Sequence, residues 1–143
     1  MIWFVTDVSV AAKWVLRGPE EQLVPQAREL LLQFGKGEIQ VVVPDLFWVE
    51  LGNVLWKAVR AGRCTRLVAE SGMHEVKQQG LITASSHTLI EAAFDIAIRF
   101  NRTVYDSIYV ALARRRGAQL ITADERLANA LAAHLPVKWL GAF

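Results

Sequence analysis

Acidic residues follow the short apolar runs of this chain at four separate points. Each lies at or just past the place where an apolar run gives way to a helical pattern: Asp7, Glu50, Asp106 and Asp124. Carboxylates that meet at one place repel one another and raise each other's pKa unless a cation neutralises them. Mg²⁺ and Mn²⁺ prefer such oxygen ligands, and Mg²⁺ usually binds one or two carboxylates together with water. The chemistry open to such a site is metal-assisted attack of water on a phosphate.

The predicted secondary structure would bring these carboxylates together. Short apolar runs predict strands at residues 2–6, 40–43, 81–84, 119–122 and 136–140. Helical periodicity predicts helices at residues 8–16, 20–34, 46–61, 65–79, 86–100, 107–116 and 125–134. This alternation indicates the α/β class, as a three-layer α/β/α sandwich with a central parallel sheet. Functional groups of such folds collect at the carboxyl ends of the strands, so all four carboxylates are expected at that edge.

Each carboxylate also has a purely structural interpretation. Asp7 and Asp106 sit where a helix is expected to begin, and aspartate is a common N-cap. Asp124 lies within a Thr-x-x-Glu pattern, which is typical of a capping box. Glu50 lies beside the apolar stripe of its helix, where an ordinary solvated glutamate is also expected. Capping and metal binding can share one helix start, so both interpretations stay open at this point.

Length and composition limit the remaining possibilities. A chain of 143 residues, 53% of them hydrophobic, fits one domain spanning residues 1–143 with a sizeable core. A net charge of +2 permits nucleic-acid binding without indicating it. Cys64 is the only cysteine, so no disulfide can form within the chain, and the three histidines are scattered. No signal peptide or membrane-spanning run is visible, so a cytoplasmic protein without membrane contact is expected.

Four segments around these carboxylates resemble the motifs of a known family. They are residues 5–16 (VTDVSVAAKWVL), 44–58 (PDLFWVELGNVLWKA), 104–113 (VYDSIYVALA) and 120–131 (LITADERLANAL). In order and separation they resemble the motifs of PIN-domain ribonucleases, and in particular the VapC-like toxins of type II toxin–antitoxin pairs. The resemblance implies a Mg²⁺-dependent endoribonuclease, with Mn²⁺ as an alternative ion. It further implies RNA as the substrate, a VapB-like antitoxin as the partner and a homodimer.

The resemblance also assigns roles to residues of this chain. The metal ligands and catalytic carboxylates would be Asp7, Glu50, Asp106 and Asp124. Ser9 and Thr122 would orient carboxylates or waters through hydrogen bonds. The residues that contact RNA are not assigned. Basic residues that could guide the RNA backbone are Lys13, Arg17, Arg60, Arg63 and Arg66, whereas the arginines at 114–116 are expected more as a solvated helix end. Trp14 and Trp48 could stack on bases, although their apolar neighbours favour a core or interface position.

Other functions are compatible with parts of this pattern. A phosphatase of the haloacid-dehalogenase type needs a second aspartate two residues after the first, where this chain has Ser9. A receiver domain needs an acidic pair and a lysine after a late strand, and this chain has neither. A catalytically silent RNA- or antitoxin-binding module is disfavoured by the complete acidic set. A housekeeping RNA-processing nuclease would use the same residues as a toxin, so the neighbouring gene must separate those two.

Overall fold

Five short parallel strands form the central sheet. They are β1 (Ile2–Thr6), β2 (Ile39–Pro44), β3 (Ile82–Ala84), β4 (Gln119–Thr122) and β5 (Val137–Trp139), in the order β3-β2-β1-β4-β5. The computed structural model describes all residues from 1 to 143. Five of the six residues of β2 are buried, as expected for an apolar run whose two faces are both covered by helices.

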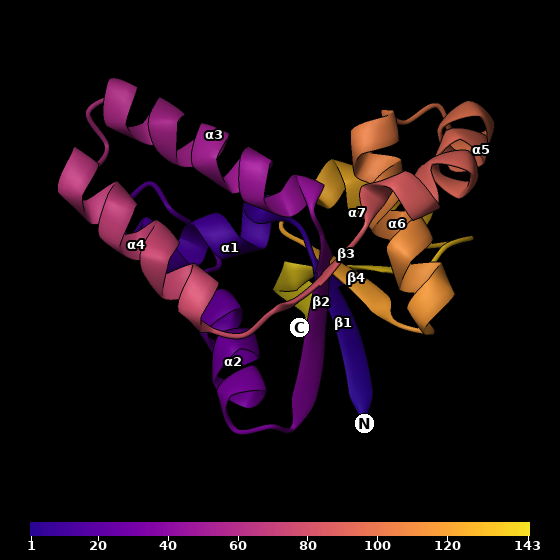
Figure 1. The fold of residues 1–143 in the computed structure, drawn as a ribbon, viewed down its shortest axis with the longest axis horizontal. Coiled ribbons are helices and arrows are strands. Elements are labelled where there is room, and N and C mark those ends of the chain that lie inside the picture. The colour runs from indigo at the N-terminus through magenta and orange to yellow at the C-terminus, as the bar shows by residue number, and fades with distance from the viewer.

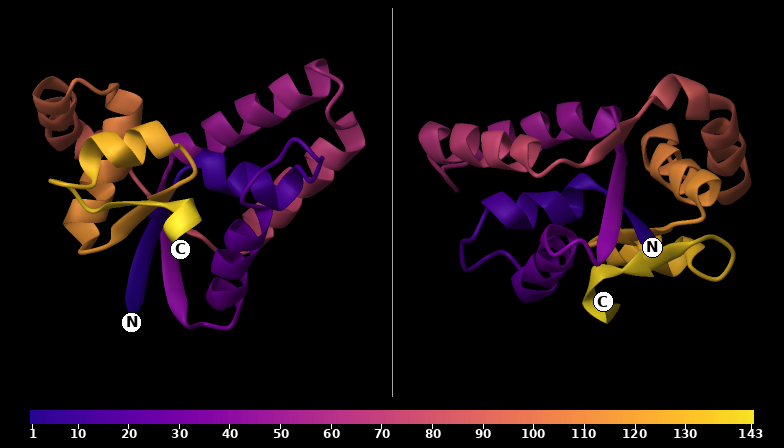
Figure 2. Two further views of the ribbon diagram at one scale, coloured as in Figure 1. Left: turned by 180° about the vertical axis from the view of Figure 1, so that it is seen from behind. Right: turned by 60° about the horizontal axis from the view of Figure 1, so that its bottom comes forward.

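Seven α-helices cover the two faces of this sheet. They are α1 (Val8–Val15), α2 (Val24–Gly35), α3 (Leu46–Arg60), α4 (Arg66–Gln78), α5 (Ile90–Phe100), α6 (Val104–Arg116) and α7 (Glu125–Leu131), with short 3₁₀ turns at Ser86–Leu89 and Leu140–Ala142. Helices α1–α4 lie on one side of the sheet and α5–α7 on the other (Figure 1), and both views of Figure 2 agree. The predicted three-layer α/β/α sandwich is therefore confirmed.

Helix α6 is the central helix of its layer and differs most from its prediction. It packs against β1, β2, β4 and α5, and every residue from 107 to 113 is buried. Because residues 107–113 contact neighbours all around, this stretch of the helix has no solvated polar face. The helix also begins at Val104 rather than at the predicted Ser107, because Thr103 caps it.

The segment before α2 is another difference. Residues 20–23 were expected to be helical, but α2 begins at Val24, after Leu23 in the left-handed conformation at φ +60°. Pro25 then occupies the first turn, where its missing N–H costs no helical hydrogen bond. Glu20 and Glu21 instead form ion pairs with Arg63 at the turn between α3 and α4.

The strand order reverses between β1 and β4. Strands β2 and β3 extend the sheet from one side of β1, and β4 and β5 extend it from the other. Thr6 pairs with Ile121, so Asp7, just past β1, lies next to Thr122, the last residue of β4. Ligand sites of open parallel sheets lie at such a reversal, outside the carboxyl ends of the strands. None of the helices combines the length and the hydropathy needed to cross a bilayer.

Candidate active site

Asp7 is fixed at the strand-order reversal by hydrogen bonds to both of its carboxylate oxygens. Its Oδ1 accepts a hydrogen bond from the Ser9 backbone N–H at 3.1 Å and another from the Ser9 hydroxyl. Its Oδ2 accepts from the Thr122 hydroxyl at 2.6 Å. Asp7 is also the N-cap of α1, as predicted. The carboxylate is therefore oriented by side chains from two motifs that are more than 110 residues apart in the chain.

Ser9 and Thr122 extend this network across the two strand ends. The Ser9 hydroxyl oxygen accepts from the Ala123 backbone N–H at 2.9 Å and lies 3.3 Å from the Thr122 hydroxyl oxygen. The Thr122 oxygen in turn accepts from the Asp124 backbone N–H at 3.1 Å. These bonds tie the segment after β1 to the segment after β4. This is the geometry that the predicted orienting role of both hydroxyls requires.

The electrostatic environment of Asp7 disfavours its charge. Burial raises the pKa of Asp7 to about 6 from its ordinary value of 3.8. The hydrogen bonds from Ser9 and Thr122 lower the pKa because they stabilise the carboxylate, whereas the negative charge of Asp106 raises it further. A positive charge placed beside Asp7 would therefore be strongly attracted to it.

Glu50 lies one turn into α3 and is half-buried beside α6. The hydroxyl of Tyr109, from α6, donates a hydrogen bond to Glu50 Oε1 at 2.5 Å. Burial raises the pKa of Glu50, the Tyr109 hydrogen bond lowers it, and the charge of Asp106 raises it. Burial and the Glu50 carboxylate together raise the pKa of Tyr109, so this hydroxyl stays protonated as a donor. Glu50 is therefore held between two helices and is not a freely solvated side chain.

Asp106 lies in the first turn of α6 and is half-buried. The N-cap of this helix is Thr103, whose hydroxyl accepts from the Asp106 backbone N–H at 3.1 Å. The expectation that Asp106 itself caps the helix is therefore wrong, which leaves its carboxylate free of a capping bond. Burial and the charge of Asp124 raise the pKa of Asp106, and the Thr103 hydrogen bond and the Arg102 charge lower it.

Asp124 is the exposed member of the acidic set. Its Oδ1 accepts from the Leu127 backbone N–H at 3.2 Å, so Asp124 is the N-cap of α7. The expected Thr-x-x-Glu capping box is replaced by this cap, because the Thr122 hydroxyl donates to Asp7 instead. The charge of Asp124 still raises the pKa of Asp106, so the two carboxylates interact.

The carboxylates gather at one edge of the sheet without touching. Asp106 is the common neighbour, since its charge raises the pKa of Asp7 and Glu50 and its own pKa is raised by Asp124. No three acidic, histidine or cysteine side chains lie close enough together to enclose a metal ion. The arrangement suits an ion held by one or two carboxylates and completed by water, which is how Mg²⁺ is commonly bound.

Sequence reasoning missed Tyr109 as a member of this site. Tyr109 is 2% exposed, yet its hydroxyl meets a carboxylate rather than the apolar core. The available signal was its position three residues after Asp106, because residues i and i+3 share one face of a helix. The apolar neighbours of Tyr109 concealed that signal, since they favour a core aromatic.

The tryptophans and arginines considered for RNA contact lie in different surroundings. Trp14 is buried and its indole N–H donates to the Ala27 carbonyl at 2.9 Å, so it is a core residue. The Trp48 indole donates to the Thr83 hydroxyl at 3.0 Å. The arginines at 114–116 are exposed at the end of α6, as expected for a solvated helix terminus.

Comparisons with known proteins agree with this architecture. The sequence model of the PIN domain matches residues 4–131. Ribonuclease VapC3 from Pyrobaculum aerophilum is 36% identical over 87 residues, a match that spans 59% of this chain and 66% of that protein. The crystal structure of PAE2754 from the same organism has a TM-score of 0.71 at 20% identity, covering 99% of this chain and 85% of that one. A toxin–antitoxin complex from Klebsiella pneumoniae has a TM-score of 0.64 at 15% identity, with 94% of each chain covered.

Proposed function

The chain belongs to the PIN-domain family, and from this premise we propose that it is a Mg²⁺-dependent endoribonuclease acting as the toxin of a toxin–antitoxin pair. The observation that carries the proposal is the position of Asp7. It lies at the strand-order reversal, is oriented by Ser9 and Thr122, and is electrostatically coupled to Asp106. The similarity to a protein named as a ribonuclease supports the same reaction class.

The donor set fits Mg²⁺. The four carboxylates offer only oxygen ligands, and burial together with neighbouring negative charge raises the pKa of Asp7, Glu50 and Asp106, so a cation beside them would be favoured. We assign Asp7 and Asp106 as the residues that would hold the ion, directly or through water, with Glu50 and Asp124 beside them. When bound, the ion would lower the pKa of a water molecule and offset charge on the phosphate. Mn²⁺ prefers the same ligands.

The side chains of the site have separable tasks in RNA hydrolysis. Ser9 and Thr122 keep both oxygens of Asp7 in fixed directions, so the carboxylate need not reorient when the substrate arrives. Glu50 exchanges a proton closer to neutral pH than an ordinary glutamate, because its pKa is raised. Tyr109 holds Glu50 against α6 and limits that rise.

Cleavage of a labelled pool of total RNA by the purified protein tests the proposal. We expect fragments with Mg²⁺ and none with EDTA, and none with Mg²⁺ when Asp7 is replaced in Asp7→Asn. The fragments would also reveal the target, since tRNA, ribosomal RNA and messenger RNA are all candidates. Cleavage by Asp7→Asn at the wild-type rate would overturn the assignment of the site.

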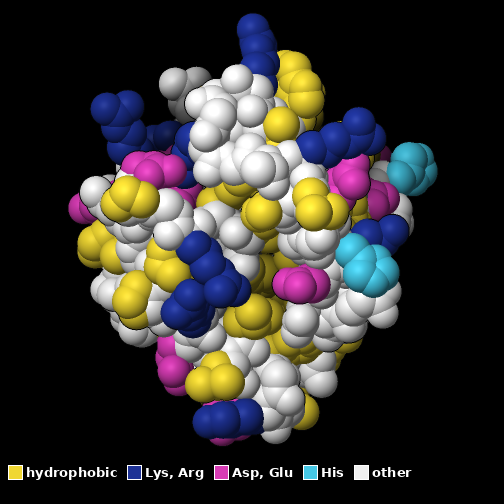
Figure 3. Space-filling view, turned by 90° about the vertical axis from the view of Figure 1, so that its left-hand side faces the viewer, with side chains coloured by type: hydrophobic (Ala, Val, Ile, Leu, Met, Phe, Trp, Pro, Cys, Tyr) yellow, Lys and Arg dark blue, Asp and Glu magenta, His cyan; other side chains and the backbone are white.

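A groove between α1 and α4 is our candidate site for an antitoxin. It forms a cavity of about 470 Å³ lined by Trp14, Val15, Arg17, Leu67, Val68, Ser71, Gly72 and Glu75. Leu67 is 72% exposed, and Gly72 lets the two helices approach because any Cβ there would collide with Val15. Figure 3 views this side of the molecule and shows apolar side chains among charged ones. Such a surface suits an amphipathic segment of a partner.

The toxin role and a housekeeping role predict different neighbouring genes. A toxin is expected beside a short reading frame that encodes a DNA-binding antitoxin, whereas an RNA-processing nuclease needs none. A solved complex with the same fold is a toxin with its antitoxin, which favours the toxin role. Co-purification of this chain with the product of such a neighbouring frame would support the role, and a gene that stands alone would contradict it.

A homodimer would cover a second apolar surface, which lies on α3, α5 and α6. Its exposed side chains are Val49, Ile90, Phe94, Ile98 and Tyr105, with exposed fractions between 40% and 72%. Ile90, Phe94 and Ile98 recur every four residues and so form one stripe along α5. Val49, Ile90 and Tyr105 line a common cavity of about 620 Å³. Contiguous apolar surface of this kind commonly marks a protein interface.

A further inference from the structure

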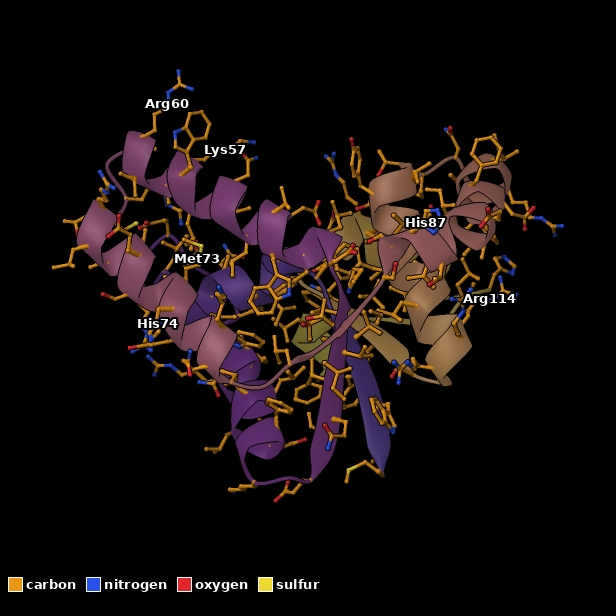
Figure 4. The ribbon with its side chains drawn as sticks, in the orientation of Figure 1. Lys57, Arg60, Met73, His74, His87 and Arg114 are labelled. Carbon is orange, nitrogen blue, oxygen red and sulfur yellow. The ribbon has the colours of Figure 1, made fainter.

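The outer face of α3 combines an exposed aromatic ring with two cations. Trp56 is 54% exposed, an unusual position for a large aromatic side chain. The guanidinium of Arg60 lies over the Trp56 ring, 5.4 Å from its centroid. Lys57 is exposed beside them, and neither Lys57 nor Arg60 takes part in an ion pair. In Figure 4, Lys57 and Arg60 project from the outer side of α3, away from α4.

Lys57 connects this face to the acidic edge, and Trp56 and Arg60 lie further around α3. Lys57 follows Glu50 by seven residues, so the two lie within about 20° of each other around the helix. Trp56 and Arg60 follow Glu50 by about 9 and 15 Å along the helix axis, at 1.5 Å per residue, and are turned from it by about 120° and 80° around the helix. Asn53, which is also exposed, lies between Glu50 and Trp56 in the sequence. The far end of α3 projects from the body of the molecule in both views of Figure 2, so this face is open to a long ligand.

We propose that Trp56, Lys57 and Arg60 form a platform that binds single-stranded RNA beside the cleavage site. A base would stack on the Trp56 ring, the Arg60 guanidinium would support that ring, and Lys57 would contact the backbone phosphate. This inference rests on the proposed ribonuclease function and adds the form of the substrate to it. Single-strand sites combine stacking rings with cations in this way, whereas a base inside a duplex exposes no face for stacking.

Charge favours RNA over a protein as the occupant of this face. Lys57 and Arg60 carry unpaired positive charges, and burial of unpaired charges against an apolar partner is unfavourable. A second copy of the chain would bring two further cations to the same face, with no carboxylate to neutralise them. Phosphates supply that negative charge, and release of their counterions adds to the affinity.

Fluorescence anisotropy with a labelled single-stranded oligoribonucleotide of about 12 nucleotides tests the platform. Binding is measured in EDTA, so that no cleavage occurs. We expect Trp56→Ala to bind at least about fivefold more weakly, whereas Trp56→Phe, which keeps a stacking ring, retains most of the affinity. Lys57→Ala should reduce the salt dependence of binding by about one phosphate contact. A duplex of the same sequence should respond little to Trp56→Ala.

Leu32→Ala is the matched control, because Leu32 is also 54% exposed but lies on α2. Wild-type affinity in Trp56→Ala, or no binding of single-stranded RNA by the wild type, would overturn the platform. A change of oligomeric state in Trp56→Ala without loss of RNA affinity would overturn it in favour of a protein interface. Binding is measured without Mg²⁺, so it does not depend on cleavage. If Trp56 contributes to RNA affinity but the protein never cleaves RNA, the platform stands and only the nuclease function is refuted.

Discussion

The position of Asp7 favours an oriented carboxylate but disfavours its negative charge when no cation is bound. Its carboxylate caps α1 and is oriented by Ser9 and Thr122, but burial raises its pKa to about 6. The native state therefore holds the charged form at a free-energy cost that the unfolded chain does not have. Such a cost is typical of functional sites, where a ligand later compensates for it.

Asp7→Asn should stabilise the metal-free protein at neutral pH. A raised native pKa means that the native state binds a proton more tightly than the unfolded state between about pH 4 and 6, so wild-type stability falls as pH rises through that window. Above pH 6, the variant should be more stable than the wild type by about 1–3 kcal/mol. The lost hydrogen bond from Thr122 reduces this gain. Urea unfolding in EDTA at pH 4 and pH 7.5 measures the difference. An advantage that is the same at both pH values would contradict the assignment.

Tyr109→Phe should change the pH dependence of cleavage. The substitution removes the hydroxyl that donates to Glu50 and lowers its pKa, so Glu50 should become protonated at a higher pH than in the wild type. The acidic limb of the pH–rate profile should then move towards neutral pH, with a loss of stability of about 1–2 kcal/mol. Tyr105→Phe is the control, because that hydroxyl is on the same helix but exposed. An unchanged acidic limb in Tyr109→Phe would exclude Glu50 from proton transfer.

The sequence predicted that four carboxylates gather at one edge of the sheet, but not the contacts that hold them there. Asp7, Glu50 and Asp124 follow from strand-to-helix junctions, because a parallel sheet brings those junctions to one edge. Asp106 follows helix α5 instead of a strand, and it reaches the same edge through the first turn of α6. The contact between Tyr109 and Glu50 was not predictable, since it depends on how α3 and α6 pack. Thr103, and not Asp106, is the N-cap of α6, because the helix begins three residues earlier than the apolar pattern indicated.

At the scale of elements, the apolar pattern located every strand but misplaced helix starts. Strand β4 matches its prediction at both ends because its apolar run is bounded by polar residues. Helix α6 is buried on all sides from residue 107 to residue 113, so no periodicity marked where it begins. Before α2, Glu20 and Glu21 form ion pairs with Arg63 and lie in a loop, and no local pattern reveals a partner so distant in the chain.

Thr103→Ala should destabilise the protein through the start of α6. The Thr103 hydroxyl accepts from the Asp106 backbone N–H, and loss of such an N-cap costs about 1 kcal/mol. Thr103→Ser keeps the acceptor and should remain within a few tenths of a kcal/mol of the wild type. Urea unfolding of the three proteins measures both differences. Equal stabilities of the alanine and serine variants would show that the cap contributes nothing.

At the scale of the whole molecule, two apolar surfaces remain on opposite layers of the sandwich. The groove between α1 and α4 is on one layer, and the α5 stripe is on the other. The sequence, with 53% hydrophobic residues, did not indicate where such surface lies. The proposed dimer and the proposed antitoxin would therefore use separate surfaces.

Ile98→Glu should convert the proposed dimer to a monomer. Ile98 is 70% exposed at the end of the α5 stripe, and a glutamate at a symmetric interface would face apolar surface of the second copy. Analytical ultracentrifugation measures the mass, with Leu32→Glu on α2 as the control. A wild type that sediments as a monomer, or a dimer that survives Ile98→Glu, would show that the stripe is not the dimer interface.

The most direct test of the account is the cleavage rate of one identified RNA substrate by matched aspartate variants in Mg²⁺. Asp7→Asn and Asp106→Asn remove the charge of the two proposed ion-holding residues, and Asp95→Asn removes the same charge from the exposed face of α5. We predict rate losses of at least about 100-fold for the first two variants and none for Asp95→Asn. Wild-type rates in Asp7→Asn and Asp106→Asn would show that the acidic edge is not the catalytic site.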